Sequence, residues 1–334
     1  MREELKLQTR KNTPKQNSLT LIFNKLKKIR IDATLLVLLT FILLWIFKLI
    51  DLLLTNKAIE NILVIPFQLV IFILPALLFA EFRSPSRPMD YIKKLRMRRP
   101  YAYQMPLIAS GIVALSSGCL LLGFLCGGTS SLSDGFTLYN TFISRSGGGF
   151  FETLYLIIAY AAVPAICEEL IYRGILCREF ERHNVLLGII TSAIFFSLLH
   201  FDVKQIPVYL FAGIFLALSM YATGSVIVPM IIHFFYNLLG LFGQSFLSAF
   251  YNITGSIGLF IFLVFILGMV SAAIFCSSAS KSYRIRARAV SIPDRPLLPP
   301  PDRLPHLIAE MLMTPWSIAA ICFYIVVQVI NSVS

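Results

Sequence analysis

Long uncharged runs of apolar residues recur along the chain, and they restrict its possible folds more than any other feature. The chain has 334 residues, of which 57% are hydrophobic, against roughly 45–50% in soluble domains. A run of about 20 apolar residues is long enough to cross a bilayer as a helix. Backbone polar groups cannot remain unpaired in lipid, so such runs form helices. The sequence therefore predicts an all-α fold, a polytopic transmembrane helical bundle.

We expect about nine spans, with the N-terminus inside, in a multi-pass protein of the cell membrane. Lys and Arg gather in the short segments between spans, as the positive-inside rule requires. The net charge of +12 therefore indicates orientation and contact with membrane lipid rather than nucleic-acid binding. The predicted spans are 33–54, 59–80, 105–126, a fourth that begins near 150, 185–201, 206–221, 226–247, 256–276 and 315–330.

The spans form one membrane domain, 32–334, preceded by a basic cytoplasmic arm, 1–31. Within the domain, residues 150–247 contain the polar motifs described below and form the predicted catalytic core. Residues 278–314 are basic and rich in proline, which is typical of a stiff cytoplasmic linker. The six cysteines show no Cys-x-x-Cys spacing and so indicate neither a disulfide framework nor a thiolate metal site.

Three charged residues stand near the end of the fourth span. Ionisable residues in spans are costly and by default mark function. Glu169 and Arg173 are four residues apart and can pair on a helix. Glu168 points about 100° away from Glu169 and lacks that partner. The spacing predicts one glutamate held by arginine and one free for chemistry; three solvated charges at a helix end are the alternative.

Two further polar pairs lie inside apolar runs, each with a spacing of four residues. Phe196 and His200 belong to the fifth predicted span. His233 and Asn237 share one face of the seventh. A single histidine in such a run is usually a packing residue, but two histidines, an asparagine and a carboxylate pair together indicate a site.

The predicted depths of these residues agree. Glu168 precedes Asn184 by 16 residues and His200 follows it by 16. If the chain turns near Asn184, both lie roughly 24 Å from the turn, at about 1.5 Å per residue. Counted from a turn at Gly224, His233 and Asn237 lie about 13 and 20 Å deep. Three helices thus direct these side chains toward one layer.

The three motifs, in this order, resemble those of the CPBP intramembrane proteases. They are Glu-Glu-x-x-x-Arg at 168–173, Phe-x-x-x-His at 196–200 and His-x-x-x-Asn at 233–237. The family includes CAAX prenyl endopeptidases, bacteriocin-processing proteins and abortive-infection proteins, and the resemblance covers roughly residues 150–240. It implies an endopeptidase acting on membrane-associated peptides or lipidated proteins, of CAAX type or of leader and bacteriocin type.

The resemblance also implies roles for individual residues. Glu168, helped by His200, would activate a water molecule. His233 and Asn237 would donate hydrogen bonds to the oxyanion. Glu169, Arg173 and Phe196 would support the geometry. General-base catalysis and preorganised donors in a poorly solvated site are both effective means of lowering the barrier to hydrolysis.

We favour a mechanism without a metal or other cofactor. The alternative is zinc held by Glu168, His200 and His233 with an open water position. However, the His-Glu-x-x-His signature of zinc proteases is absent. Asn237 is also a poor zinc ligand but a good hydrogen-bond donor.

Two other functions remain open. A transporter could be lined by the same polar residues, although transporters commonly contain duplicated halves, which this chain does not show. A non-proteolytic scaffold or bacteriocin self-immunity protein could share the fold. A rhomboid-type site lacks a suitable serine motif, and an aspartyl-type site would need two membrane aspartates, whereas Asp51 lies at a span end and no other span contains one.

Overall fold

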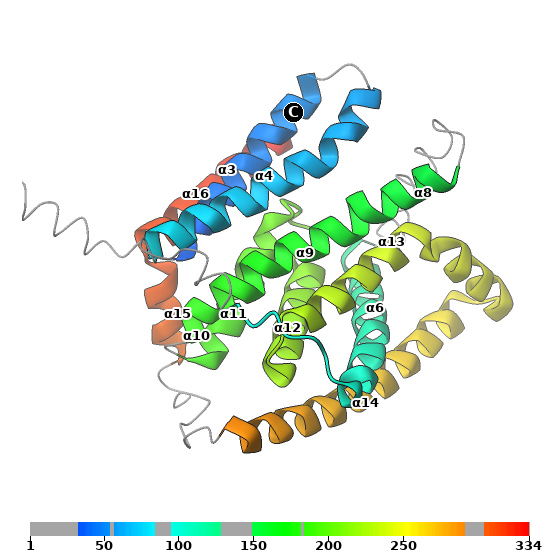
Figure 1. The fold of residues 1–334 in the computed structure, drawn as a ribbon. Helices are drawn as coiled ribbons and strands as arrows, with labels where there is room; N and C mark the ends of the chain where they lie inside the picture. The colour runs from blue at the N-terminus through cyan, green and yellow to red at the C-terminus, as the bar shows by residue number, and fades with distance from the viewer. Residues whose placement is uncertain are drawn as a thin grey trace, which may run out of the picture. The chain divides into compact units, whose positions relative to one another are not determined.

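Every regular element in the described parts of the chain is a helix (Figure 1). The computed structural model describes residues 33–53, 57–83, 95–127, 149–181, 184–290 and 304–333. Residues 33–334 form one compact unit. The predicted all-α class is confirmed, while the arm 1–31 and most of the loop between the third and fourth predicted spans lie outside the described residues.

The described helices are of very different lengths. In chain order they are α3 (Ala33–Leu53), α4 (Lys57–Arg83), the 3-10 turn η1 (Ala102–Gln104), α6 (Met105–Gly127), α8 (Phe150–Leu156), the π-helical turn η2 (Ile157–Ala162), α9 (Val163–Glu169), the π-helical turn η3 (Leu170–Leu176), α10 (Cys177–Glu181), α11 (Val185–Leu199), α12 (Ile206–Thr223), α13 (Ile227–Thr254), α14 (Ile257–Val290), α15 (Leu304–Leu312) and α16 (Pro315–Val333).

Seven helices are long and apolar enough to cross a membrane, and an eighth is counted if the bent α13 is one span. The prediction of nine spans is therefore not confirmed within the described residues. The difference is α11, which has 15 residues and a length of about 22 Å, short of the roughly 30 Å hydrocarbon core. Most of its residues are buried, so protein rather than lipid surrounds it.

The fourth predicted span forms one helical stretch from α8 to α10. Two π-helical turns, η2 and η3, separate its α-helical parts. Each turn contains a carbonyl that accepts a hydrogen bond from a side chain of a neighbouring helix. Gln68 of α4 donates to Ala159 O at 3.1 Å, and Ser192 of α11 donates to Tyr172 O at 3.0 Å. Such π-bulges occur frequently at functional sites. Here η2 precedes the two glutamates of the acidic motif, and η3 begins directly after them and contains Arg173.

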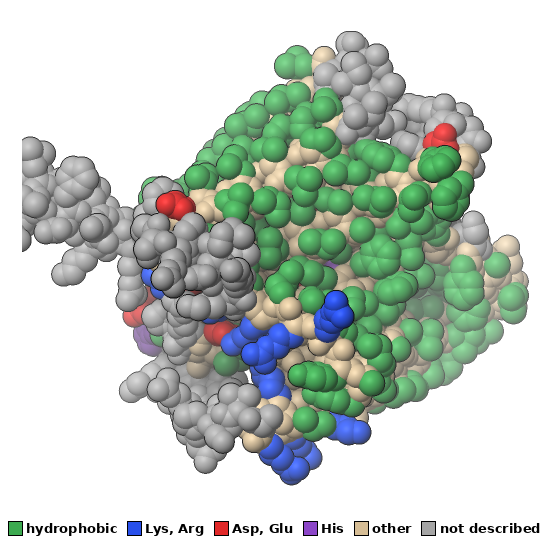
Figure 2. Space-filling view, viewed as in Figure 1, with side chains coloured by type: hydrophobic (Ala, Val, Ile, Leu, Met, Phe, Trp, Pro, Cys, Tyr) green, Lys and Arg blue, Asp and Glu red, His purple; other side chains and the backbone are tan. Residues whose placement is uncertain are grey.

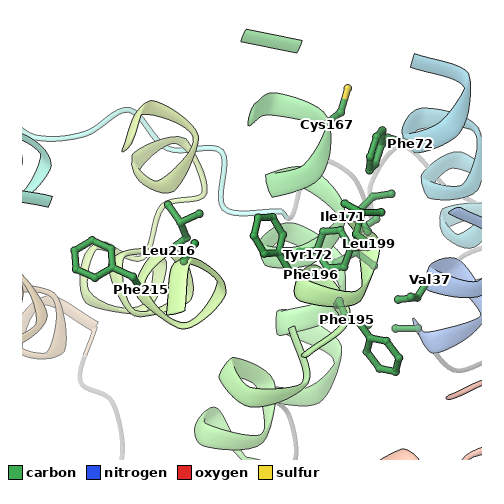
Figure 3. Packing of buried hydrophobic residues seen from close by; sticks show 14 of the residues in the cluster. Val37, Phe72, Cys167, Ile171, Tyr172, Phe195, Phe196, Leu199, Phe215 and Leu216 are labelled. Atoms are coloured by element: carbon green, nitrogen blue, oxygen red, sulfur yellow. The ribbon is translucent and has the colours of Figure 1, made fainter. Parts of the chain in front are cut away.

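The predicted hairpin between the fourth span and α11 is present. Asn184 is the N-cap of α11, and its side chain accepts the backbone N–H of Leu186 at 2.8 Å, which satisfies a donor that the helix itself cannot. In Figure 3, Tyr172 of η3 lies beside Phe196 of α11. The two rings meet edge to face with centroids 5.6 Å apart. This packing brings the acidic motif next to the Phe-x-x-x-His motif.

Large apolar side chains cover the surface of the long helices. On α14, Phe262 and Met269 are more than half exposed, and hydrophobic side chains dominate the face shown in Figure 2, with Lys and Arg gathered toward one end. Exposed apolar area on this scale needs a nonaqueous surrounding. Together with the candidate spans, it shows a multi-pass membrane protein.

The segment 278–314 is more helical than the predicted linker. Helix α14 continues to Val290, and α15 occupies Leu304–Leu312. The basic residues at the end of α14 stand on a helix because they are good helix formers. The proline-rich part between these helices lies outside the described residues.

Candidate active site

The predicted pair of Glu169 and Arg173 is present and fully buried. Arg173 Nη1 donates to Glu169 Oε1 at 2.6 Å, and both side chains have no exposed surface. The second guanidinium nitrogen, Nη2, donates to the carbonyl of Gly213 on α12 at 3.1 Å. A Cβ at Gly213 would lie 2.8 Å from Ala193 Cα, so glycine permits the close approach of α11 and α12. The pair therefore joins η3 to α12.

A histidine from a third helix completes this buried group. His233 of α13 has its Nδ1 atom 2.9 Å from Glu169 Oε1, and only 5% of the residue is exposed. Because a carboxylate accepts hydrogen bonds, the proton of this contact belongs to Nδ1. The motif spacing predicted only the Glu169–Arg173 pair and not this bond, because no spacing within one helix reveals a contact between two helices.

Glu168 has a different environment from its neighbour. Its Oε2 atom is buried and has no hydrogen-bond partner among the described residues. His233 approaches it from α13, with Nε2 4.0 Å from Glu168 Oε2. A buried polar atom without a partner is rare in native proteins and requires a functional or solvent explanation. Glu169 Oε2 also has no hydrogen-bond partner among the described residues. The two carboxylates therefore differ in that Glu169 binds Arg173 and His233 through Oε1, whereas Glu168 approaches His233 only at 4.0 Å.

Phe196 is the common neighbour of the charged and aromatic groups. Its ring centroid lies 5.1 Å from that of His200 and 5.8 Å from that of His233. The guanidinium carbon of Arg173 lies 4.3 Å from the same centroid, within the range of cation–π attraction. The predicted supporting position of Phe196 thus has a physical basis, because one rigid ring contacts groups from all three motifs.

His200 is the C-cap of α11, and two contacts hold its ring. Nδ1 lies 3.0 Å from Phe196 O, and because a carbonyl only accepts, Nδ1 carries the proton. In the neutral imidazole, Nε2 is then a proton acceptor. Tyr209 of α12 stacks on the ring with centroids 3.7 Å apart and an angle of 12°. The sequence analysis missed Tyr209, which no motif includes.

Asn237 lies one helical turn beyond His233 on α13 and is half-buried. Residues four apart lie on one face of a helix, so its amide is on the side of α13 that carries His233. The structure therefore brings Glu168, Glu169, Arg173, Phe196, His200 and His233 into one cluster and leaves Asn237 adjacent to it.

A zinc ion would need the side chains of Glu168, His200 and His233 to converge on one point. Among the described residues, no three His, Cys, Asp or Glu side chains converge closely enough to hold a metal ion. His233 also uses Nδ1 for Glu169, which leaves only Nε2 for any ligand. A carboxylate bound to the other ring nitrogen is also the common arrangement of a metal-binding histidine, so the mechanism without zinc stays a prediction.

The fold and the cluster define a multi-pass helical membrane protein with a buried carboxylate–histidine site. Residues 150–239 match the family model described as type II CAAX prenyl endopeptidase Rce1-like. The matched segment contains all three motifs, so the resemblance seen in the sequence is confirmed there. No curated protein and no solved structure matches the chain. The matched family is one of CAAX-type intramembrane proteases, which supports peptidase activity at the level of the family.

Proposed function

We propose that the protein is an intramembrane endopeptidase that uses Glu168 to activate water. The observation that carries the proposal is the contrast between two adjacent glutamates. The Oε2 atoms of both glutamates have no hydrogen-bond partner among the described residues. However, Glu169 Oε1 is shared by Arg173 and His233, whereas Glu168 approaches His233 Nε2 only at 4.0 Å. A carboxylate free to accept a proton, in a site of low polarity, suits a general base.

His200 assists Glu168 at the water molecule. With Nδ1–H committed to Phe196 O, its Nε2 lone pair is available to accept a hydrogen bond from water. Stacking on Tyr209 limits rotation of the ring. Glu168 takes the proton as the water oxygen attacks the substrate carbonyl, and then donates it to the leaving amine as the C–N bond breaks.

His233 stabilises the oxyanion in its doubly protonated form. Its Nδ1–H is bound by Glu169, so Nε2 is a donor only in the imidazolium state. With Glu168 and Glu169 ionised and Arg173 and His233 positive, the cluster is neutral. When Glu168 accepts a proton, the cluster gains one positive charge as the oxyanion forms. Asn237 supplies a second donor from the same face of α13.

The substrate class is a peptide or lipidated protein cleaved near the membrane surface. The family match favours the C-terminal segment of a prenylated protein, in which a modified cysteine precedes the bond to be cleaved. Leader or bacteriocin-type peptides are the second class to examine. A scaffold or immunity protein of the same fold would bind such peptides without cleaving them.

The test is cleavage of a prenylated CAAX peptide by purified protein in detergent or nanodiscs, followed by mass spectrometry. We predict that Glu168→Gln abolishes product formation while expression and thermal stability stay at the wild-type level, because the amide keeps the shape but cannot act as a base. The matched control is Glu152→Gln, which changes an acidic residue at the start of α8 and should leave cleavage unchanged. Retention of wild-type cleavage by Glu168→Gln would overturn the catalytic assignment.

A further inference from the structure

The residue that follows His200 has a strained backbone. Phe201 has φ +49°, in the left-handed region that bulky residues rarely adopt. It occupies the position after the C-cap of α11, where a residue of this conformation is usually glycine. A non-glycine residue persists in such a conformation only when its surroundings enforce it. The contacts of Phe201 show which parts of the molecule do so.

Helices far away in sequence hold Phe201 in place. Gln328 of α16 donates from Nε2 to the carbonyl of Phe201 at 2.8 Å. The Phe201 ring stacks on Tyr324 of α16, with centroids 5.5 Å apart, and meets Phe41 of α3 edge to face at 5.4 Å. Tyr324 and Gln328 are one turn apart, so the same face of α16 binds both the ring and the carbonyl.

The turn between α11 and α12, residues 200–205, positions the ring of His200. Directly after Phe201, Asp202 Oδ1 accepts the backbone N–H groups of Lys204 and Gln205 at 3.0 and 3.3 Å, and α12 then begins at Ile206. The turn thereby brings Tyr209 onto the His200 ring. A change in the backbone at Phe201 would shift the end of α11 relative to α12, and with it the stacked pair.

We infer that α16 is a positioning element of the active site, acting through Gln328 and Tyr324 on Phe201 and so on His200. The inference rests on the proposed function, because it concerns the geometry of the assisting base. It extends the machinery to a helix outside residues 150–239, the segment that the family model covers. It also gives a reason for an amide in the apolar span of α16, where an unpaired polar group would be costly.

The experiment measures kcat and KM of Gln328→Leu with the prenylated CAAX peptide. Leucine suits an apolar span, so folded yield should match the wild type. We expect kcat to fall roughly 10- to 100-fold, the scale of a misplacement of about 1 Å, with KM unchanged. The control is Asn331→Ala, which removes the 3.4 Å contact between Lys48 Nζ and Asn331 Oδ1, another link between α3 and α16, and should leave kcat unchanged.

A second variant tests the role of the strained residue itself. Glycine adopts positive φ without steric cost, so Phe201→Gly keeps the turn but removes the ring that Tyr324 and Phe41 contact. This variant should lower kcat, and because both changes act through the same residue, its combination with Gln328→Leu should lose less than the product of the two single losses. Wild-type kcat in Gln328→Leu, an equal loss in Asn331→Ala, or fully independent losses in the double variant would each overturn the inference. If wild-type cleavage depends on Glu168 while Gln328→Leu is fully active, this inference alone fails. If no Glu168-dependent cleavage occurs, the proposed function fails.

Discussion

Two glutamates adjacent in sequence acquire different chemistry from their partners. Glu169 is fully buried, and both Arg173 and His233 contact its carboxylate. Glu168 is 12% exposed and only approaches His233 at 4.0 Å. Both glutamates have an Oε2 atom without a hydrogen-bond partner among the described residues, but only Glu169 is held by short bonds through its Oε1 atom. A carboxylate without such bonds remains able to bind water or substrate. The environment, rather than the residue type, thus distinguishes Glu169 from Glu168, the carboxylate that we propose activates water.

At this scale we predict that Glu169→Gln destabilises the protein. The amide leaves Arg173 buried without its counter-ion and weakens the bond to His233, and removal of one partner of a buried pair costs about 3–5 kcal/mol. Thermal unfolding in detergent should show a clear loss of stability, with lower folded yield. Glu168→Gln is the matched variant and should unfold like the wild type. Equal stability of the two variants would contradict the division of roles.

At the scale of elements, the spacing of motifs predicted much of the site. A separation of four residues predicted the Glu169–Arg173 pair, and the apolar runs predicted the helices. Three features were not predictable. Side chains of other helices, Gln68 and Ser192, bind carbonyls in the π-helical turns. The His233–Glu169 bond joins two helices. Phe201 adopts a backbone conformation that its residue type disfavours. Each depends on tertiary contacts that local spacing does not contain.

The first π-helical turn provides an element-scale prediction. Gln68→Leu removes the donor to Ala159 O, and hydrogen bonds between membrane helices contribute about 0.6 kcal/mol on average and up to about 1.7 kcal/mol. The free energy of unfolding in mixed micelles should fall within this range, with cleavage retained. Leu69→Ala, at an exposed neighbouring position, is the control for general loss of side-chain volume. A higher free energy of unfolding in Gln68→Leu would indicate that the Gln68–Ala159 hydrogen bond does not stabilise the protein.

At the scale of the whole molecule, the site depends on helices from both ends of the described chain. Residues 150–239 match the family model, yet α3 and α16 contact the turn that follows His200, and α4 contacts the span that carries Glu168. The outer helices thus do more than anchor the protein in lipid. They fix the ends and bends of the helices that carry the reactive groups.

Exhaustive chelation of the purified protein tests the mechanism as a whole. If Glu168 and His200 activate water unaided, cleavage should persist after treatment with a strong chelator, and metal analysis should find less than one zinc per chain. A zinc-dependent enzyme would instead lose activity on chelation and regain it when zinc is added. That paired loss and recovery, with one zinc per chain, would replace the metal-free mechanism.

The orientation of the protein in the membrane is the last prediction. Arg98 lies next to the turn that ends α12, because Ser225 Oγ donates to the Arg98 carbonyl, and Lys204 precedes the start of α12. Both side chains are exposed, and α12 is a candidate span, so the two residues should lie on opposite sides of the membrane. The charge of the flanking segments places Arg98 in the cytoplasm. In a cysteine-free variant, Lys204→Cys should react with an impermeant thiol reagent added outside intact cells, and Arg98→Cys should react only after permeabilisation. The reverse pattern would invert the topology, and labelling of both from one side would show that α12 does not cross.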